Sequence, residues 1–216
     1  MKMLRPAAQL LGTILISLSI SSTVLKTIVL LAFWTAAFWP LKPAEIIQFF
    51  IVNVIFVISN YGALKNGVFE FAKKDILLMP YNELFMWGFY CLFVQRTLQL
   101  KDISQGQRKA SVIYAAVFAV SFSVIRDEVI LAGFLATLLL SAVAFFRSKQ
   151  DMLSVALFTL TGILIESSGL WKGFWYYPHA RYFELPLWGP LMWANIGMIV
   201  SRIAPALVYG PLEQYE

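Results

Sequence analysis

Long apolar runs separated by short polar junctions dominate the pattern along this chain. A membrane-spanning helix needs roughly 20 mostly apolar residues. Six runs reach or approach that length: residues 24–41, 44–60, 76–98, 129–146, 152–169 and 187–209. Two shorter runs, 7–22 and 110–125, are richer in Ser and Ala. We therefore expect eight helices, the two short ones tilted or partly immersed, and seven spans if the first does not cross the membrane.

Composition strengthens this picture. Of the 216 residues, 60% are hydrophobic and only 13% are charged, about half the charged share of a soluble domain. The aromatic share of 16% excludes a disordered chain. Cys91 is the only cysteine and His179 the only histidine, which argues against a disulfide scaffold and against a structural zinc site. The predicted class is an all-α, polytopic transmembrane helical bundle.

The two halves of the sequence align without gaps at an offset of 106 residues. The pairs that this offset superposes include Gly67 on Gly173, Pro80 on Pro186, Met86 on Met192, Trp87 on Trp193, Arg96 on Arg202, Glu45 on Asp151, Phe69 on Trp175, and Phe71 on Tyr177. The alignment predicts two four-helix repeats, residues 1–106 and 107–216, within a single integral-membrane domain. Because four is an even number, both repeats would have the same orientation in the membrane, which makes them parallel repeats.

The distribution of basic residues predicts the orientation. With the N-terminus inside, ten Lys and Arg residues fall in inner loops and ends and seven fall outside. This count favours both termini on the cytoplasmic side of a bacterial-type inner membrane. The net charge of +5 then belongs to loops facing an anionic membrane surface, and no nucleic-acid partner is expected. Lys2 and Arg5 before a short apolar run also fit a signal peptide, but no convincing cleavage site follows.

Two loops, residues 61–75 and 170–184, would face outward in this orientation. Both begin an aromatic stretch at a glycine, Gly67 in one and Gly173 in the other. One interpretation is an aromatic belt at the level of the lipid head groups. The other is a lid over a cavity between the helices. The nearby sequence Arg126-Asp127-Glu128 is interpreted as a solvated turn.

Two carboxylates, Glu83 and Glu166, lie within the apolar runs, where an ionisable group costs a few kcal/mol. Such groups mark function or pair with another side chain. Facing one cavity, the two acids could protonate and deprotonate an apolar substrate. The alternative is that each caps a helix or pairs with an arginine. Arg96 and Arg202, near the inner helix ends, are interpreted as reaching toward lipid phosphates.

Other polar and aromatic side chains could line the same space. The expected substrate-binding residues are Asn60, Tyr81, Asn82, Trp87, Trp175 and Trp193. Indole faces can stabilise a carbocation. Asparagine side chains also join membrane helices, and tryptophans also serve as packing or interfacial anchors, so both alternatives stay open. The sequence contains no phosphate-binding glycine loop, nucleophile elbow or histidine cluster, and we expect neither metal nor cofactor.

Certain motifs resemble the lycopene cyclase domain family. Residues 67–71 (Gly-Val-Phe-Glu-Phe) are similar to its G-x-W-x-F loop, and 79–85 (Met-Pro-Tyr-Asn-Glu-Leu-Phe) to its L-P-x-E-E-x-x-F helix start. In the second half, residues 166–193 are similar to the related carotenoid hydratases. Small membrane-bound terpene cyclases share this style of helical bundle with buried acids. The chain departs from the family at its paired acids, which are Asn82-Glu83 here and Trp188-Gly189 in the second half.

The resemblance implies a cofactor-independent cyclase or hydratase-like enzyme that acts on a lipophilic isoprenoid or its epoxide. Glu83 or Glu166 would donate a proton, aromatic faces would shield the cation, and the second acid would accept a proton. The expected partners are the lipid bilayer and a lipophilic small molecule. Two alternatives stay open: a small-solute transporter or channel lined by Glu83, Glu166 and Asn60, and a non-catalytic membrane assembly subunit.

Overall fold

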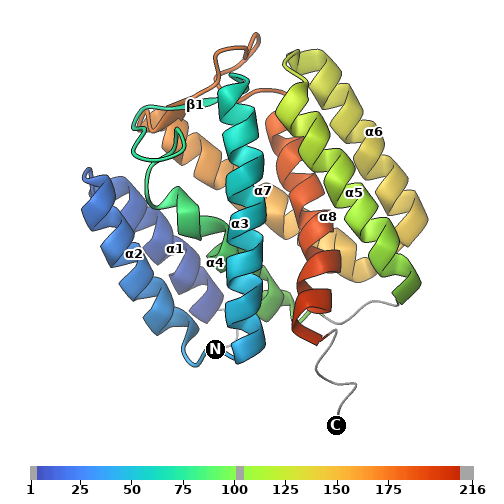
Figure 1. Cartoon of the computed structure of the whole chain (residues 1–216). Helices are drawn as coiled ribbons and strands as arrows, with labels where there is room; N and C mark the ends of the chain where they lie inside the picture. The colour runs from blue at the N-terminus through green and yellow to red at the C-terminus, as the bar shows by residue number, and fades with distance from the viewer. Residues whose placement is uncertain (1–3, 101–104, 210–216) are drawn as a thin grey trace.

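The computed structural model describes residues 4–100 and 105–209, and within them the fold is all-helical apart from one two-stranded sheet (Figure 1). The elements in chain order are α1 (Leu4–Ser19), α2 (Thr23–Phe38), α3 (Pro43–Lys65), β1 (Glu70–Phe71), α4 (Glu83–Leu98), α5 (Gln105–Val124), α6 (Glu128–Phe146), α7 (Lys149–Trp171), β2 (Trp175–Tyr176) and α8 (Trp188–Tyr209). The prediction of eight helices is confirmed for the described residues.

One predicted helix starts in the wrong place. The apolar run 76–98 was expected to be helical throughout, but α4 begins only at Glu83. The preceding residues form a tight turn, in which Ile76 and Met79 exchange backbone hydrogen bonds of 3.0 and 2.9 Å. Leu77 and Leu78 inside this turn have left-handed φ values of 50° and 64°. Pro80 contributes to the break, because a proline disfavours helical backbone at the residue before it.

Four helices, α3, α4, α7 and α8, form the centre of the bundle, with the pair α1–α2 on one flank and α5–α6 on the other (Figure 1). α1 contacts α7 and α4 as well as α2, and α5 contacts α3 and α8 as well as α6. Each flanking pair therefore packs across both halves of the chain. The first turn of α1 and the last turn of α8 lie at the same end of the bundle (Figure 1).

The described helices differ in how far they suit a membrane. Three of them, α3, α6 and α7, are long and apolar enough to cross one, while α2 is apolar but has only 16 residues. α4 also has 16 residues, most of them buried inside the bundle. Its apolar composition is explained by contact with neighbouring helices. Outward-facing side chains such as Leu140 and Leu160 are exposed, at 68% and 70%.

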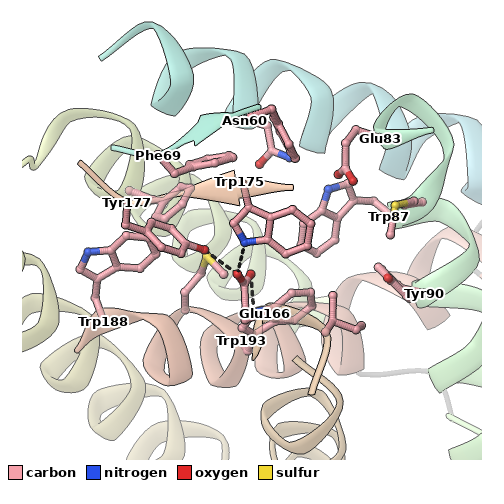
Figure 2. Close-up of a pocket in the computed structure, with 15 residues that line it drawn as sticks. Asn60, Phe69, Glu83, Trp87, Tyr90, Glu166, Trp175, Tyr177, Trp188 and Trp193 are labelled. Carbon is pink, nitrogen blue, oxygen red and sulfur yellow. Dashed lines mark hydrogen bonds between the residues drawn. The ribbon is translucent and has the colours of Figure 1, made fainter. Parts of the chain in front are cut away.

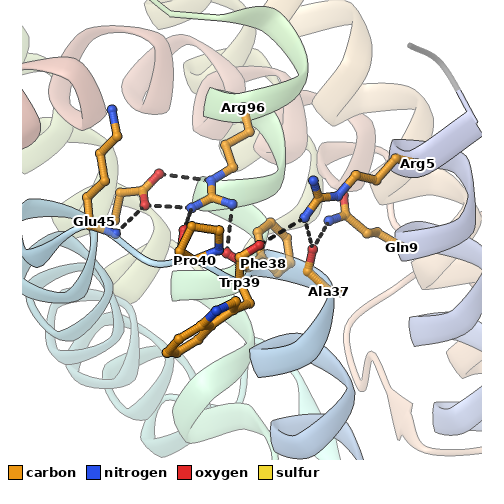
Figure 3. A network of polar contacts seen from close by, with 9 residues as sticks. Arg5, Gln9, Ala37, Phe38, Trp39, Pro40, Glu45 and Arg96 are labelled. Carbon is orange, nitrogen blue, oxygen red and sulfur yellow. Dashed lines mark hydrogen bonds and ion pairs between the residues drawn. The ribbon is translucent and has the colours of Figure 1, made fainter. Parts of the chain in front are cut away.

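At the end of the bundle near the start of α3, each half of the chain has one ion pair that joins two of its helices. Arg96 on α4 donates to both carboxylate oxygens of Glu45 on α3, at 2.9 and 2.6 Å, and to the carbonyls of Phe38 and Pro40 (Figure 3). Arg202 on α8 pairs in the same way with Asp151 on α7. The interpretation of both arginines as groups reaching toward lipid phosphates is wrong. Each arginine is held by a carboxylate, because an unpaired charge inside the protein would be costly.

Both ion pairs and the sheet follow the offset of 106 residues. Glu45 and Asp151, and Arg96 and Arg202, are each separated by that number, as are the strand partners Glu70 and Tyr176.

Candidate functional site

The two aromatic loops pair with each other over the other end of the bundle. Gly67 after α3 and Gly173 after α7 have positive φ values of 72° and 64°, which turn the chain back in the same way in both loops. The strands that follow are antiparallel, with Glu70 opposite Tyr176. Side chains alternate along a strand, so every second residue faces the bundle. The pairing forms a cover across the ends of the central helices.

Beneath this cover lies a cavity of about 60 Å³ with mainly aromatic walls, which we call the aromatic cavity (Figure 2). Its aromatic lining consists of Phe69, Phe71, Trp87, Tyr90, Phe122, Trp175, Tyr177, Trp188 and Trp193, and its other polar lining residues are Asn60, Glu83 and Glu166. Phe69 and Phe71 are buried. Of the two interpretations of the loops, a lid over a cavity fits these inward-facing side chains, whereas an aromatic belt does not explain them.

Glu166, near the end of α7, accepts three hydrogen bonds. The indole nitrogen of Trp175 and the hydroxyl of Tyr177 donate to its Oε2 at 2.7 and 2.6 Å, and the indole nitrogen of Trp193 donates to Oε1 at 3.1 Å (Figure 2). Donors directed at both oxygens stabilise the ionised form of a buried carboxyl group. The surroundings of Glu166 therefore suit a carboxylate that accepts a proton or faces a positive charge.

Glu83, the first residue of α4, has a different environment. It is buried, and its hydrogen bond comes from the side-chain amide of Asn82 at 3.3 Å. A buried carboxyl group with so few donors is better accommodated in its neutral form. The same cavity thus contains one acid that is rich in donors and one that is poor in them, an arrangement that separates the roles of proton donor and proton acceptor.

Two indoles in the wall of the cavity stack on each other. The rings of Trp87 on α4 and Trp193 on α8 have centroids 5.3 Å apart and an angle of 25° between their planes. Trp193 donates to Glu166, whereas the indole nitrogen of Trp87 is buried and has no hydrogen-bond partner in the described chain. An unsatisfied buried donor in a cavity wall is available to a ligand, because leaving it unpaired costs about 1–3 kcal/mol.

Six of the eight site residues predicted from the sequence line this cavity: Asn60, Glu83, Trp87, Glu166, Trp175 and Trp193. Asn82 lies beside it and lines two neighbouring cavities instead. Tyr81 does not line the aromatic cavity. It is exposed, and its backbone N–H donates to Asp75 at 3.2 Å. The structure therefore does not place Tyr81 at the candidate site.

Several lining residues were not predicted. Tyr177 is the most important of them, because its hydroxyl gives Glu166 its shortest hydrogen bond. A signal existed: in a strand, Tyr177 faces the same side as Trp175, two residues earlier, and Phe69 and Phe71 have the same spacing. Tyr90 is seven residues after Glu83, two helical turns further along the same face of α4.

The predicted solvated turn at residues 126–128 is only partly solvated. Glu128 is 1% exposed and accepts hydrogen bonds from the backbone N–H groups of Arg181 and Leu187, at 2.7 and 2.8 Å. It therefore fastens the segment between β2 and α8 to the start of α6. The interpretation of Glu128 as a solvent-facing charge is wrong, because two backbone donors replace its water contacts. Asp127 caps α6 and binds the Arg181 side chain.

Within residues 4–100 and 105–209, no three His, Cys, Asp or Glu side chains come together in a way that could hold a metal ion.

Comparisons with known proteins give a likeness of fold and nothing about activity. No protein-family model matches the chain, and no curated protein is similar to it in sequence. The fold is similar to that of MvINS. A crystal structure of a cross-linked MvINS trimer superposes with a TM-score of 0.61 over 80% of this chain and 98% of that one, at 14% sequence identity. At so low an identity the similarity concerns the arrangement of the helices alone.

Proposed function

We propose that the chain is a membrane-embedded, cofactor-independent enzyme of cyclase or hydratase type that acts by acid–base chemistry on a lipophilic isoprenoid. The observation that carries this proposal is the position of Glu83 and Glu166 in the wall of one aromatic cavity with unequal hydrogen bonding. Buried acids with different environments are a recurrent basis for assigning donor and acceptor roles. The motif resemblance supports the same reaction class.

The membrane setting of this proposal is supported by the three long apolar helices and by apolar side chains on the outer faces of α6 and α7. Soluble proteins rarely expose contiguous apolar surface on this scale. We place all eight helices at membrane depth as a multi-pass bundle, with both termini on the cytoplasmic side of an inner membrane and the aromatic cover on the other side.

In the proposed mechanism Glu83 donates its proton to an alkene carbon or an epoxide oxygen at the cavity wall. The positive charge that develops on the substrate carbon lies against the faces of Trp87 and Trp193, which are worth about 2 kcal/mol or more to a desolvated cation. Glu166 then takes a proton from the carbon next to the cation, or from a water molecule that adds to it. One proton enters and one leaves, so the substrate is isomerised or hydrated without a redox partner.

The size of the aromatic cavity sets a condition on this mechanism. A volume of about 60 Å³ holds roughly four water molecules at ~15 Å³ each, so it encloses only the reacting group of a substrate. The remaining chain must lie outside it. Two neighbouring cavities that share Glu83 and Trp175 offer a continuation. A substrate that places more than its reacting group at Glu166 requires the β1–β2 cover to move.

We also propose that the site arose between two copies of a duplicated four-helix unit, residues 1–106 and 107–216. Positions 106 residues apart face the same cavity: Asn60 and Glu166, Phe69 and Trp175, Phe71 and Tyr177, Trp87 and Trp193. Equivalent residues of two parallel repeats are expected to meet at the junction between the repeats.

The test is conversion of candidate isoprenoids and their epoxides by purified protein, followed by mass spectrometry, with the variants Glu83→Gln and Glu166→Gln. Each substitution removes a proton-transfer group while keeping the shape, and a loss of about 100-fold or more is expected. Glu184→Gln, at an exposed glutamate of the outer segment, is the matched control and should leave conversion unchanged.

Conversion that both substitutions leave intact would refute the mechanism. Solute flux into liposomes that collapses in the same two variants, with no conversion, would favour a transporter. A partner protein that co-purifies in stoichiometric amount, with neither conversion nor flux, would favour an assembly subunit.

A further inference from the structure

A second cavity, of about 210 Å³, shares the lining residues Phe71, Glu83 and Trp175 with the aromatic cavity. Three lysines line it, Lys26 from the first turn of α2, Lys73 after β1, and Lys172 at the end of α7. We call it the lysine vestibule. Glu83 is the only acidic residue among its described lining residues. The vestibule therefore has an excess of two to three positive charges, depending on whether Glu83 is ionised.

The charges of the vestibule extend from exposed to buried positions. Lys73 and Lys172 are exposed at the mouth, whereas Lys26, Asn82 and Glu83 are buried at the floor. The Lys26 side chain is only 7% exposed. Its ammonium group lies 4.0 Å from the centroid of the Phe174 ring and forms no ion pair with any described residue. Glu83 attracts this ammonium group across the cavity, but no described carboxylate lies within ion-pair distance of it. A buried ammonium group without a close carboxylate is costly, and it favours a ligand that brings a negative charge.

The two lysines at the mouth are also without carboxylate partners in the described chain. Lys73 donates to the backbone carbonyl of Ser21 at 2.9 Å, and Lys172 lies 4.7 Å from the centroid of the Trp171 ring. Neighbouring Lys74 differs, because it forms a 2.6 Å ion pair with Glu70. Lys74 is thus held by a close carboxylate, whereas none of the three lysines that line the vestibule forms an ion pair with a described residue.

We propose that the lysine vestibule binds the phosphate-ester head group of an amphipathic ligand whose apolar chain begins at Glu83 and the aromatic cavity. A phosphate monoester carries a charge of about −1.5 to −2, close to the excess of the vestibule. The shared lining residues Glu83 and Trp175 connect the two cavities. This inference rests on the proposed function only where it directs the chain of the ligand toward the acids. Head-group binding stands on the lysines alone.

The test measures equilibrium binding of radiolabelled dodecyl phosphate to the full chain in phosphatidylcholine nanodiscs, with empty nanodiscs subtracted. Saturable binding is expected, and Lys26→Gln and Lys73→Gln should each weaken it by about tenfold or more, since each removes a charge-assisted contact. Lys26→Arg keeps the charge and should retain most of the affinity. Lys65→Gln, at an exposed lysine of the same end of the bundle, is the matched control and should bind like the unchanged protein.

Competition distinguishes the source of the phosphate. Displacement of the probe by phosphatidic acid as well as by unlabelled dodecyl phosphate would identify a membrane lipid as a source, and displacement by the single-chain ester alone would identify a single-chain ligand. Equal displacement by inorganic phosphate would overturn the amphipathic assignment, and equal displacement by dodecanol would overturn the role of the phosphate. Binding that Lys26→Gln and Lys73→Gln leave unchanged would overturn the site.

The proposed enzymatic function can be refuted independently of head-group binding. Glu166→Gln should abolish conversion while leaving dodecyl phosphate bound, because Glu166 does not line the vestibule. Intact lysine-dependent binding without any conversion would therefore retain the vestibule and reject the enzyme.

Discussion

The two ion pairs at the end of the bundle allow a matched test of how burial changes the contribution of an ion pair to the free energy of unfolding. Arg202 and Asp151 have side chains that are each 3% exposed, whereas Arg96 is 28% and Glu45 7% exposed. We predict that Arg202→Met destabilises the protein more than Arg96→Met. In the first variant Asp151 is left as an uncompensated buried carboxylate, which typically costs about 3–5 kcal/mol.

Each acid keeps one donor, Ser201 Oγ for Asp151 at 2.8 Å and a backbone N–H for Glu45. The cost at the other pair is smaller because the Arg96 side chain is partly exposed. After Arg96→Met, Glu45 still accepts the backbone N–H of Lys42 at 2.9 Å, and water can reach the vacated position. A loss of about 1–3 kcal/mol is expected. For a chain of this size each kcal/mol corresponds to about 2–4 °C in Tm, so the shifts should be roughly 6–20 °C and 2–12 °C.

The assay is thermal unfolding of both variants in the same detergent, together with the double variant Asp151→Asn/Arg202→Met. Removing both charges should recover part of the loss, because no unpaired charge is then buried. The reasoning fails if Arg202→Met shifts Tm no more than Arg96→Met does, or if the double variant is as unstable as Arg202→Met alone.

Two further predictions concern packing and acid stability. Gly162→Ala should lower the free energy of unfolding by about 1–3 kcal/mol, since its new methyl group would collide with the Trp193 indole. Gly133→Ala is the control, because its methyl group meets nothing within 4 Å. Equal Tm values for the two variants would contradict the prediction. The pKa of Asp127 is held below its usual value, chiefly by the backbone N–H of Ile130. The Asp127 carboxylate therefore stabilises the protein above the pKa that it has in the unfolded chain. This stabilisation is lost as the pH falls through the pKa that it has in the folded protein. Asp127→Asn should therefore flatten the loss of Tm below about pH 4, and an unchanged acid profile would reject this account.

The sequence was sufficient for the helices because each apolar run is bounded by polar or turn-forming residues. It was insufficient at residues 76–82, where an apolar run folds as a turn. Composition cannot separate the two cases, since apolar side chains are compatible with either. Leu77 and Leu78 have left-handed backbone in this turn, and their side chains are exposed. It was also insufficient at Glu128, whose partners are backbone groups more than 50 residues away.

For the site, the two acids could be identified from the sequence because an ionisable side chain inside an apolar run is costly. That argument does not require knowledge of which residues they contact. It did not reveal what holds them. Arg96 and Arg202 were correctly placed near helix ends, yet their carboxylate partners depend on which helices are neighbours. Two of the three donors to Glu166, Trp175 and Tyr177, come from the loop that pairs with β1 over the bundle, and the third, Trp193, comes from α8.

The differences between positions 106 residues apart bear most directly on function. Where the second half has Glu166, Trp175 and Tyr177, the first half has Asn60, Phe69 and Phe71. These positions differ as a set, and the set is physically consistent. A buried carboxylate needs donors aimed at its oxygens, and both aromatic residues beside Glu166 supply one. An asparagine is neutral, so phenylalanines without donors suffice beside it. Glu83 then introduces a second acid at a position matched by Gly189 in the other half. One acid supplied with donors and another nearly without them in the same cavity is the difference on which the proposed proton transfer rests, because unequal environments separate the roles of donor and acceptor.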